Sequence, residues 1–302
     1  MADAESTFAA GGPIDLVATL APLAHATPDP CLRFRSGEVW RATRTPDGPA
    51  TERLTAARGR ISVEAWGPGA AWAVAHASEL AGVHVDGAFV APDPLLRELR
   101  RREPGVRIPR SRAVLEALIP AVLEQKVPGE EARQAYRRLV WTLGEHAPRP
   151  PGAPALAVPP PPARLMATPY QVFHRFGIER RRAETIRRAA SYAGRLEEAV
   201  EMEPARARQR LMALPGVGEW TAAEVAVTAL GDLDAVSVGD YHLPHVVAYA
   251  LAGEPRGDDE RMLELLEPYR PHRALAIRLL LRAGLGPGRR GARMPLNKQL
   301  GF

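Results

Sequence analysis

The pattern of hydrophobic and polar residues changes character near residue 94. Before that point, apolar residues occur in short runs, and turn-forming residues such as Pro46, Asp47 and Gly48 separate them. The clearest runs lie at residues 32–34, 39–40 and 61–66. Short runs bounded by turn residues are typical of strands, whereas residues 69–80 have the spacing of a helix. This part of the chain is predicted to form a small antiparallel sheet backed by one helix, after a flexible N-terminus at residues 1–30.

From Pro94 onward, apolar residues recur every three or four positions, which indicates helices. The strongest pattern covers residues 111–127, where Ser111 is the expected N-cap and Pro128 ends the helix. Further helices are predicted at residues 130–143, 169–176, 180–193, 204–212, 219–230, 243–251, 258–267 and 272–283. Residues 148–162 are dense in proline and are predicted to form an extended surface loop.

These patterns together predict an α+β fold with two structured parts. After the flexible N-terminus, an α+β N-terminal domain covers residues 31–93, and a helical region covers residues 94–285. A helical hairpin at residues 205–230 lies within the helical region, and a basic C-terminal tail follows at residues 286–302. A chain of 302 residues is long enough for two such parts, each with its own core.

Composition narrows the class of protein. The single cysteine, Cys31, excludes an internal disulfide, a multi-cysteine zinc site and an iron–sulfur cluster. No apolar run approaches the roughly 18 residues that span a bilayer. Asp3 and Glu5 make the N-terminus acidic, whereas a secretory signal begins with basic residues. We therefore expect a cytoplasmic protein that is not bound to a membrane.

Positive charge is carried almost entirely by arginine. The chain has 40 lysine and arginine residues, a net charge of +5, and only two lysines, Lys126 and Lys298. Arginine clusters suit bidentate binding of phosphate. The most basic stretch, residues 97–112, is either a solvated face or part of a nucleic-acid footprint.

A glycine-rich turn separates two of the predicted helices. Pro215 disfavours helical geometry at Leu214, and Gly216 and Gly218 adopt backbone angles that other residues avoid. A new helical pattern begins directly after them. The resulting hairpin leaves backbone N–H groups free at a helix start, which is a ready site for phosphate.

The residues of this turn carry a family resemblance. The run Leu-Pro-Gly-Val-Gly-x-x-Thr-Ala begins at Leu214, and Val-Gly-Asp, ending at Asp240, follows about twenty residues later. This combination resembles the helix-hairpin-helix-Gly/Pro-Asp (HhH-GPD) DNA glycosylases, and most of all the AlkA-type DNA-3-methyladenine glycosylases II. The resemblance implies an α+β domain before a helical catalytic region. It also implies a base-excision repair enzyme, monomeric and associated with a bacterial nucleoid, that acts on double-stranded DNA containing a damaged base.

Asp240 is the candidate catalytic residue. Hydrolysis of an N-glycosidic bond passes through an oxocarbenium-like sugar, which a nearby carboxylate stabilises while it orients the attacking water. An isolated aspartate at a helix start is usually a cap, but the Gly-Asp pairing after the hairpin favours catalysis. Family members that also cut the DNA strand carry a lysine where this chain has Trp220. The resemblance therefore implies a monofunctional hydrolase without lyase activity.

The predicted base pocket departs from the family. Trp220 and Tyr241 are expected to line it, but Glu224 and Leu281 occupy positions where the family tends to have aromatic residues. An alkylated purine is the expected lesion. The alternatives are an oxidised or otherwise modified base, or a noncatalytic helix-hairpin-helix protein that only binds DNA.

The remaining predictions concern DNA and ion contacts. Gly216, Gly218 and Thr221 are expected to bind phosphate, and Gln125 and Lys126 to fill the gap left by the extruded base. For Lys126, an ordinary helix C-terminus with a favourable cation is the alternative. The resemblance also implies a monovalent cation, Na⁺ or K⁺, on the backbone carbonyls of Met212, Leu214 and Val217. No cofactor is expected to be required, and His242 and His245 lack a third ligand for a zinc site.

Overall fold

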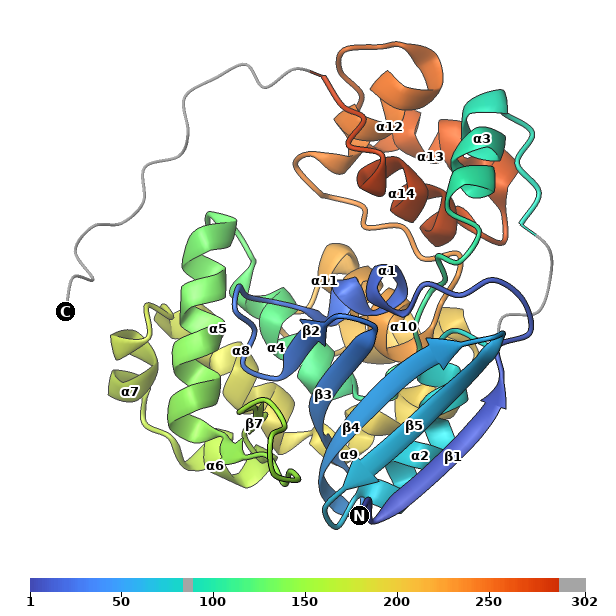
Figure 1. Ribbon diagram of the computed structural model, residues 1–302. Helices are drawn as coiled ribbons and strands as arrows, with labels where there is room; N and C mark the ends of the chain where they lie inside the picture. The colour runs from blue at the N-terminus through green and yellow to red at the C-terminus, as the bar shows by residue number, and fades with distance from the viewer. Residues whose placement is uncertain (84–88, 288–302) are drawn as a thin grey trace.

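A five-stranded antiparallel sheet and a larger body of helices make up the computed structural model, which describes residues 1–83 and 89–287 (Figure 1). The strands are β1 (Ala4–Ala9), β2 (Leu32–Arg35), β3 (Glu38–Thr45), β4 (Gly48–Ala57) and β5 (Arg60–Trp66), in the order β1-β5-β4-β3-β2. Arg58 and Gly59 both have positive φ, of 50° and 72°, which is the geometry of a tight two-residue hairpin between β4 and β5. Helix α2 (Ala70–Leu80) packs on the sheet and shares a core with it. The α+β fold class is confirmed.

The prediction of a flexible N-terminus at residues 1–30 is wrong. Strand β1 pairs with β5 from Ala4 opposite Ala65 to Ala9 opposite Arg60, so the α+β domain begins at this strand. A short helix α1 (Leu16–Leu20) and a 3-10 turn η1 (Ala21–Leu23) follow. The strand is at the sheet edge and most of its side chains are exposed, so it has no alternating apolar pattern. Its hydrogen-bond partners lie more than fifty residues away, where local sequence gives no sign of them.

The helical region closely follows the predicted segments. Its helices are α3 (Pro94–Arg102), α4 (Val114–Leu123), α5 (Gly129–Leu143), α6 (Pro162–Ala167), α7 (Tyr170–Arg175), α8 (Arg180–Ser191), α9 (Ala193–Glu197), η2 (Glu198–Glu201), α10 (Pro204–Met212), α11 (Glu219–Val225), η3 (Ala226–Leu230), α12 (Leu243–Ala252), α13 (Asp259–Leu266), η4 (Glu267–Tyr269) and α14 (Arg273–Arg282). One apolar core joins α4, α5, α8 and α11, and a second joins α3 to α12, α13 and α14 (Figure 1). Helix α3 therefore packs beside the last helix of the chain. Within the described residues, no helix has the length and apolar character that crossing a membrane requires.

The start of α4 differs from its prediction. The helix begins at Val114 rather than after Ser111, because Glu197 of α9 supplies the cap from another part of the chain. The Glu197 carboxylate accepts hydrogen bonds from the N–H groups of Val114 and Leu115, both at 2.9 Å. Burial raises the pKa of Glu197 to about 7. A tertiary contact thus replaces the expected local cap.

The proline-dense segment is extended, as predicted, but its second half is buried. Strand β7 (Ala157–Val158) pairs with β6 (Glu145–His146), and Leu156 and Val158 pack in one cluster with Trp40 and Trp66. The two tryptophan rings are stacked, with 5.5 Å between their centroids. The segment therefore covers the end of the sheet and joins it to the helical region. Of the predicted basic tail at residues 286–302, the part from residue 288 onward lies outside the described residues.

Candidate active site

Asp240 lies at the end of a turn that leads into α12. Gly239 has a φ of +88°, and its N–H donates to both carboxylate oxygens of Asp259, each at 3.1 Å. The Oδ1 atom of Asp240 accepts hydrogen bonds from the backbone N–H groups of His242, at 2.7 Å, and Leu243, at 2.8 Å. These bonds fix one carboxylate oxygen against the helix start and leave the other directed away from it.

That second oxygen meets the helical hairpin. The indole Nε1–H of Trp220, in the first turn of α11, donates to Oδ2 of Asp240 at 3.0 Å. Both residues are only partly buried. The two parts of the sequence signature, which are twenty residues apart, are therefore in direct contact. This contact positions a carboxylate beside an aromatic ring, the arrangement expected where a sugar cation forms next to a bound base.

Two further carboxyl groups lie close to Asp240. Glu224, one turn after Trp220, accepts a hydrogen bond from the hydroxyl of Ser237. Burial raises the pKa of Glu224, and the negative charge of Asp240 adds to the effect. Glu124, at the C-terminal end of α4, has its pKa raised to about 7, first by desolvation of the carboxyl and then by the charges of Glu224 and Asp240. Glu124 as a whole is exposed, so the negative charges of Glu224 and Asp240 contribute to its higher pKa in addition to desolvation.

Sequence reasoning missed Glu124 as a chemical group. In the sequence, Glu124 simply ends an amphipathic helix. The one sign of a functional role is that it directly precedes the candidate wedge residues Gln125 and Lys126. The fold brings it to the active site because α4 packs against α11, which carries Trp220 and Glu224. Asp259, which holds Gly239, was also missed, since on sequence it is simply one of several acidic residues at a helix start.

The hairpin leaves two backbone donors free, although Gly216 alone of its two glycines has the unusual backbone angles that were predicted, and Gly218 is extended. Gly216 has a φ of +99°, and the N–H groups of Gly216 and Gly218 make no hydrogen bond to any described residue (1–83 and 89–287). Both glycines are exposed. Thr221 differs, because its side chain is 2% exposed and its hydroxyl accepts from Nε2 of Gln125 at 2.9 Å. The Thr221 side chain is therefore not accessible to a phosphate, which corrects that part of the prediction.

The two candidate wedge residues have different environments. Gln125 is half-buried and also donates to the carbonyl oxygen of Gly216 at 3.0 Å, so it ties the end of α4 to the hairpin. Lys126 is exposed and has a φ of +56°, a conformation that is uncommon outside glycine. The backbone thus turns sharply at Lys126 and leaves that side chain free of the hairpin.

The other side chains predicted to line the base pocket are largely exposed. Tyr241 is 82% exposed and packs edge-on against the ring of His242, 4.9 Å between centroids. Leu281 is half exposed near the end of α14. Of the carbonyls predicted to hold a cation, that of Leu214 accepts from the N–H of Val217 at 3.0 Å. Among residues 1–83 and 89–287, no group of three His, Cys, Asp or Glu side chains is arranged to hold a metal ion.

An ion pair anchors the segment that leads to Asp240. Arg273, at the start of α14, donates to both carboxylate oxygens of Asp234, each at 2.8 Å, and to the Asp234 carbonyl at 3.1 Å. Arg273 is 8% exposed. Arg270 also pairs with Asp234 at 2.8 Å. These contacts fix the start of α14 to the chain that precedes Asp240.

Comparisons with known proteins agree with this geometry. No family model matches the chain. Over 155 residues, the chain is 33% identical to the "Probable bifunctional transcriptional activator/DNA repair enzyme AlkA" of two Mycobacterium tuberculosis strains, CDC 1551 / Oshkosh and H37Rv. The match covers 50% of this chain but 30% of the relative, so the chain spans less than a third of the curated proteins that it matches.

Solved structures share the fold across nearly the whole chain. A 3-methyladenine DNA glycosylase from Archaeoglobus fulgidus has a TM-score of 0.79 and 19% identity, and the match covers 92% of this chain and 98% of that one. An 8-oxoguanine glycosylase/lyase from Clostridium acetobutylicum has a TM-score of 0.68 and 14% identity, and the match covers 89% and 92%. The chain therefore has the fold of these two glycosylase structures, and its similarity to the AlkA-named relative agrees with the resemblance found in the sequence.

Proposed function

We propose that this chain, which has the fold of the HhH-GPD glycosylases and their hairpin-to-aspartate signature, is a DNA glycosylase that removes a damaged base. It hydrolyses the N-glycosidic bond of a flipped nucleotide in double-stranded DNA and leaves an abasic site. The observation that carries this proposal is the hydrogen bond between Trp220 and Asp240, 3.0 Å long. It places a fixed carboxylate beside an aromatic surface.

The residues around Asp240 have distinct roles in this proposal. The backbone N–H groups of His242 and Leu243 hold Oδ1, so the carboxylate has one orientation before DNA arrives. Its negative charge stabilises the cationic sugar as the bond to the base breaks, and it directs water to the sugar carbon. The free N–H groups of Gly216 and Gly218 bind a phosphate of the damaged strand. Lys126 enters the space that the flipped base leaves.

Trp220 supports hydrolysis without strand cleavage. A glycosylase that also cuts the strand needs an amine at this position to form a Schiff base with the sugar. Of the two lysines in the chain, Lys126 is in the turn after α4, and Lys298 lies outside the described residues. We therefore expect that borohydride will not trap a covalent adduct between this protein and DNA; a trapped adduct would refute the monofunctional proposal.

An alkylated purine is the first candidate for the lesion, from the AlkA-type resemblance. A second candidate, a neutral modified base, is favoured by the carboxyl groups of Glu224 and Glu124. A cationic alkylpurine departs without further protonation, whereas a neutral base leaves more easily when an acid gives it a proton. Desolvation raises the pKa of Glu124 to about 7 and also raises the pKa of Glu224, so each carboxyl holds a proton more readily than an ordinary glutamate does.

Base release from defined duplexes tests the proposal. The substrates are duplexes with one methylated purine, one deaminated purine or one 8-oxoguanine, and wild type is compared with Asp240→Asn. The variant should release its base at least about a hundredfold more slowly, as expected when a charge that stabilises the transition state is lost. Asp258→Asn is a matched control, since Asp258 is also an aspartate whose Oδ1 caps a helix, α13, through the N–H of Arg261 at 2.9 Å.

The outcomes separate the three candidate functions. Release of the methylated base alone supports an alkylpurine glycosylase. Release of a deaminated or oxidised base that Glu124→Gln weakens supports the neutral-base candidate. If the protein binds each duplex but releases no base, or if Asp240→Asn is as active as wild type, the catalytic proposal fails, and binding without release indicates a noncatalytic DNA-binding protein.

A further inference from the structure

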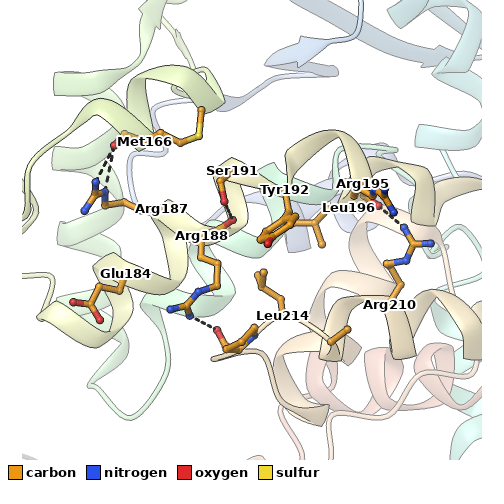
Figure 2. A pocket seen from close by; sticks show the side chains of 12 residues that line it. Met166, Glu184, Arg187, Arg188, Ser191, Tyr192, Arg195, Leu196, Arg210 and Leu214 are labelled. Atoms are coloured by element: carbon orange, nitrogen blue, oxygen red, sulfur yellow. Dashed lines mark hydrogen bonds between the residues drawn. The ribbon is translucent and has the colours of Figure 1, made fainter.

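A pocket of about 1150 Å³ lies beside the hairpin and is separate from the candidate active site. It is formed by the end of α6, by α8 and α9, and by the chain from α10 to Pro215 (Figure 2). Asp240, Trp220 and Glu224 do not line it. Its volume slightly exceeds the usual range for ligand pockets, about 300–1,000 Å³. The proposed glycosylase mechanism makes no use of this space.

Positive charge surrounds the pocket and is largely unpaired. Within the part of the chain that the structure describes, Arg187 donates to the main-chain carbonyl of Met166, Arg188 donates to that of Pro215, and neither pairs with a carboxylate. The side chain of Arg195 makes no hydrogen bond or ion pair within the part of the chain that the structure describes, residues 1–83 and 89–287. A fourth arginine, Arg210, has a carboxylate partner, Glu198, at 3.0 Å. Among the described residues, the guanidinium groups of Arg187, Arg188 and Arg195 therefore have no carboxylate partner.

The one acidic residue in the lining makes its ion pair with an arginine outside the pocket. Glu184 is paired with Arg180, at 3.8 Å, on the exposed side of α8. A bonded carbonyl leaves the other N–H groups of a guanidinium free, because each guanidinium has five donors in a planar fork. The rim of the pocket is thus prepared to bind carboxylate or phosphate groups in a bidentate manner.

The floor of the pocket is apolar. Figure 2 shows Tyr192 near its centre, beside Leu196 and Leu214, with Arg187 and Arg188 on one side and Arg195 and Arg210 on the other. Leu196 and Leu214 belong to the main helical core, whereas Tyr192 is 54% exposed and Met166 is 39% exposed. Two large apolar side chains therefore remain uncovered in one concave site. Exposed apolar surface within a rim of charge is typical of a binding site for a partner.

We propose that this pocket binds an acidic peptide segment of a partner protein that carries an aliphatic or aromatic anchor residue. Such a segment matches both features of the site, since its carboxylates pair with Arg187, Arg188 and Arg195 and its anchor covers Tyr192 and Met166. Duplex DNA would match only the positive charge of the pocket and not its apolar floor, because the outer surface of DNA offers phosphates and no apolar side chain. The contact of Arg188 with Pro215 also places the bound segment directly beside the hairpin.

Fluorescence anisotropy with the 302-residue chain tests this proposal. The probe is a fluorescein-labelled peptide of sequence Glu-Asp-Glu-Phe-Leu-Asp-Glu, and a second probe has serine in place of phenylalanine and leucine. Saturable binding of the first probe is expected, with much weaker binding of the second. Arg195→Glu should raise the Kd of the first probe about fivefold or more, as for reversal of a charge in an exposed pair. Tyr192→Ser should also weaken binding, and both residues are exposed, so these variants should fold.

Arg97→Glu is the matched control. Arg97 is also exposed, its guanidinium also donates only to a main-chain carbonyl, that of Asp93, and it lies on α3 in the other helical group (Figure 1). The proposal is overturned if the first probe does not bind, if Arg195→Glu binds it as well as wild type does, or if Arg97→Glu weakens it equally. It is also overturned if Arg195→Glu weakens binding of a labelled undamaged duplex as much as that of the peptide, which would assign the pocket to DNA. Asp240→Asn should bind the peptide normally, so the result does not depend on the proposed glycosylase activity.

Discussion

Replacing Gly216 with alanine should destabilise the protein far more than the same change at Gly218. Gly216 has a φ of +99°, where an L-residue costs about 1–2 kcal/mol. A Cβ atom there would lie 2.3 Å from Oγ1 and 3.0 Å from Cγ2 of Thr185. Thr185 is 3% exposed and donates to the Arg181 carbonyl at 3.0 Å, so it cannot rotate away without losing that bond. Overpacking of this kind adds about 1–3 kcal/mol.

The expected loss for Gly216→Ala is therefore roughly 2–5 kcal/mol in the free energy of unfolding. Gly218 is the control within the same hairpin. Its φ is −103° and its ψ is −175°, ordinary extended values, and a Cβ there would have no atom within 4 Å. Gly218→Ala should change stability by no more than about 0.5 kcal/mol. Urea denaturation followed by circular dichroism gives both values.

A double-mutant cycle with Thr185→Ala separates the two causes. Removing Oγ1 and Cγ2 should recover the overpacking part of the Gly216→Ala loss, about 1–3 kcal/mol, and leave the backbone part. Gly216→Ala should also weaken binding to all DNA sequences alike, because phosphate contacts carry no sequence information. The reasoning is refuted if the two glycine variants are equally stable, or if Thr185→Ala restores nothing.

Three shorter predictions follow from other contacts. Trp220→Phe keeps an aromatic wall but removes the N–H bonded to Asp240, so single-turnover base release should slow about tenfold or more; an unchanged rate would contradict a positioning role for the indole. Arg273→Ala should cost about 1–3 kcal/mol, because the partly buried Asp234 carboxylate loses two charge-assisted hydrogen bonds and keeps only Arg270, and urea titration showing a loss below about 0.5 kcal/mol would count against this. Since burial raises the pKa of Glu197 to about 7, the folded state binds the extra proton between about pH 4.5 and pH 7, and the free energy of unfolding falls as pH rises through that window. Glu197→Gln should flatten this slope in denaturation at pH 5, 6 and 7, and a slope that stays the same would exclude Glu197 as its source.

The helical hairpin was predictable because its signals are local. Helix α10 spans residues 204–212, as predicted, since Pro204 begins it and the Leu214-Pro215-Gly216 turn ends it. The helical periodicity of α11 and the glycine turn before it likewise depend on a few neighbouring residues. Asp240 could be named as the catalytic candidate because the Gly-Asp turn and its distance from the hairpin resemble the motif of the HhH-GPD glycosylases.

Features that depend on distant partners were not predictable in this way. Strand β1 has exposed side chains and is held by backbone hydrogen bonds to β5, which no local pattern encodes. The cap of α4 comes from Glu197, more than eighty residues beyond Val114. Thr221 was predicted at the phosphate site, but its contact with Gln125 of the α4 end buries its side chain under the hairpin.

The sequence alone predicted the class of fold and the hairpin, because these follow from periodicity and turn residues within about thirty positions. The resemblance to the HhH-GPD glycosylases then indicated Asp240 as the candidate catalytic carboxylate. The tertiary structure decided which groups surround that carboxylate. It joined Trp220 to Asp240, and it placed Glu124 where desolvation, with the charges of Glu224 and Asp240 added, raises its pKa to about 7. Electrostatic effects of this kind depend on distance in space and on burial, and neither is set by position along the chain.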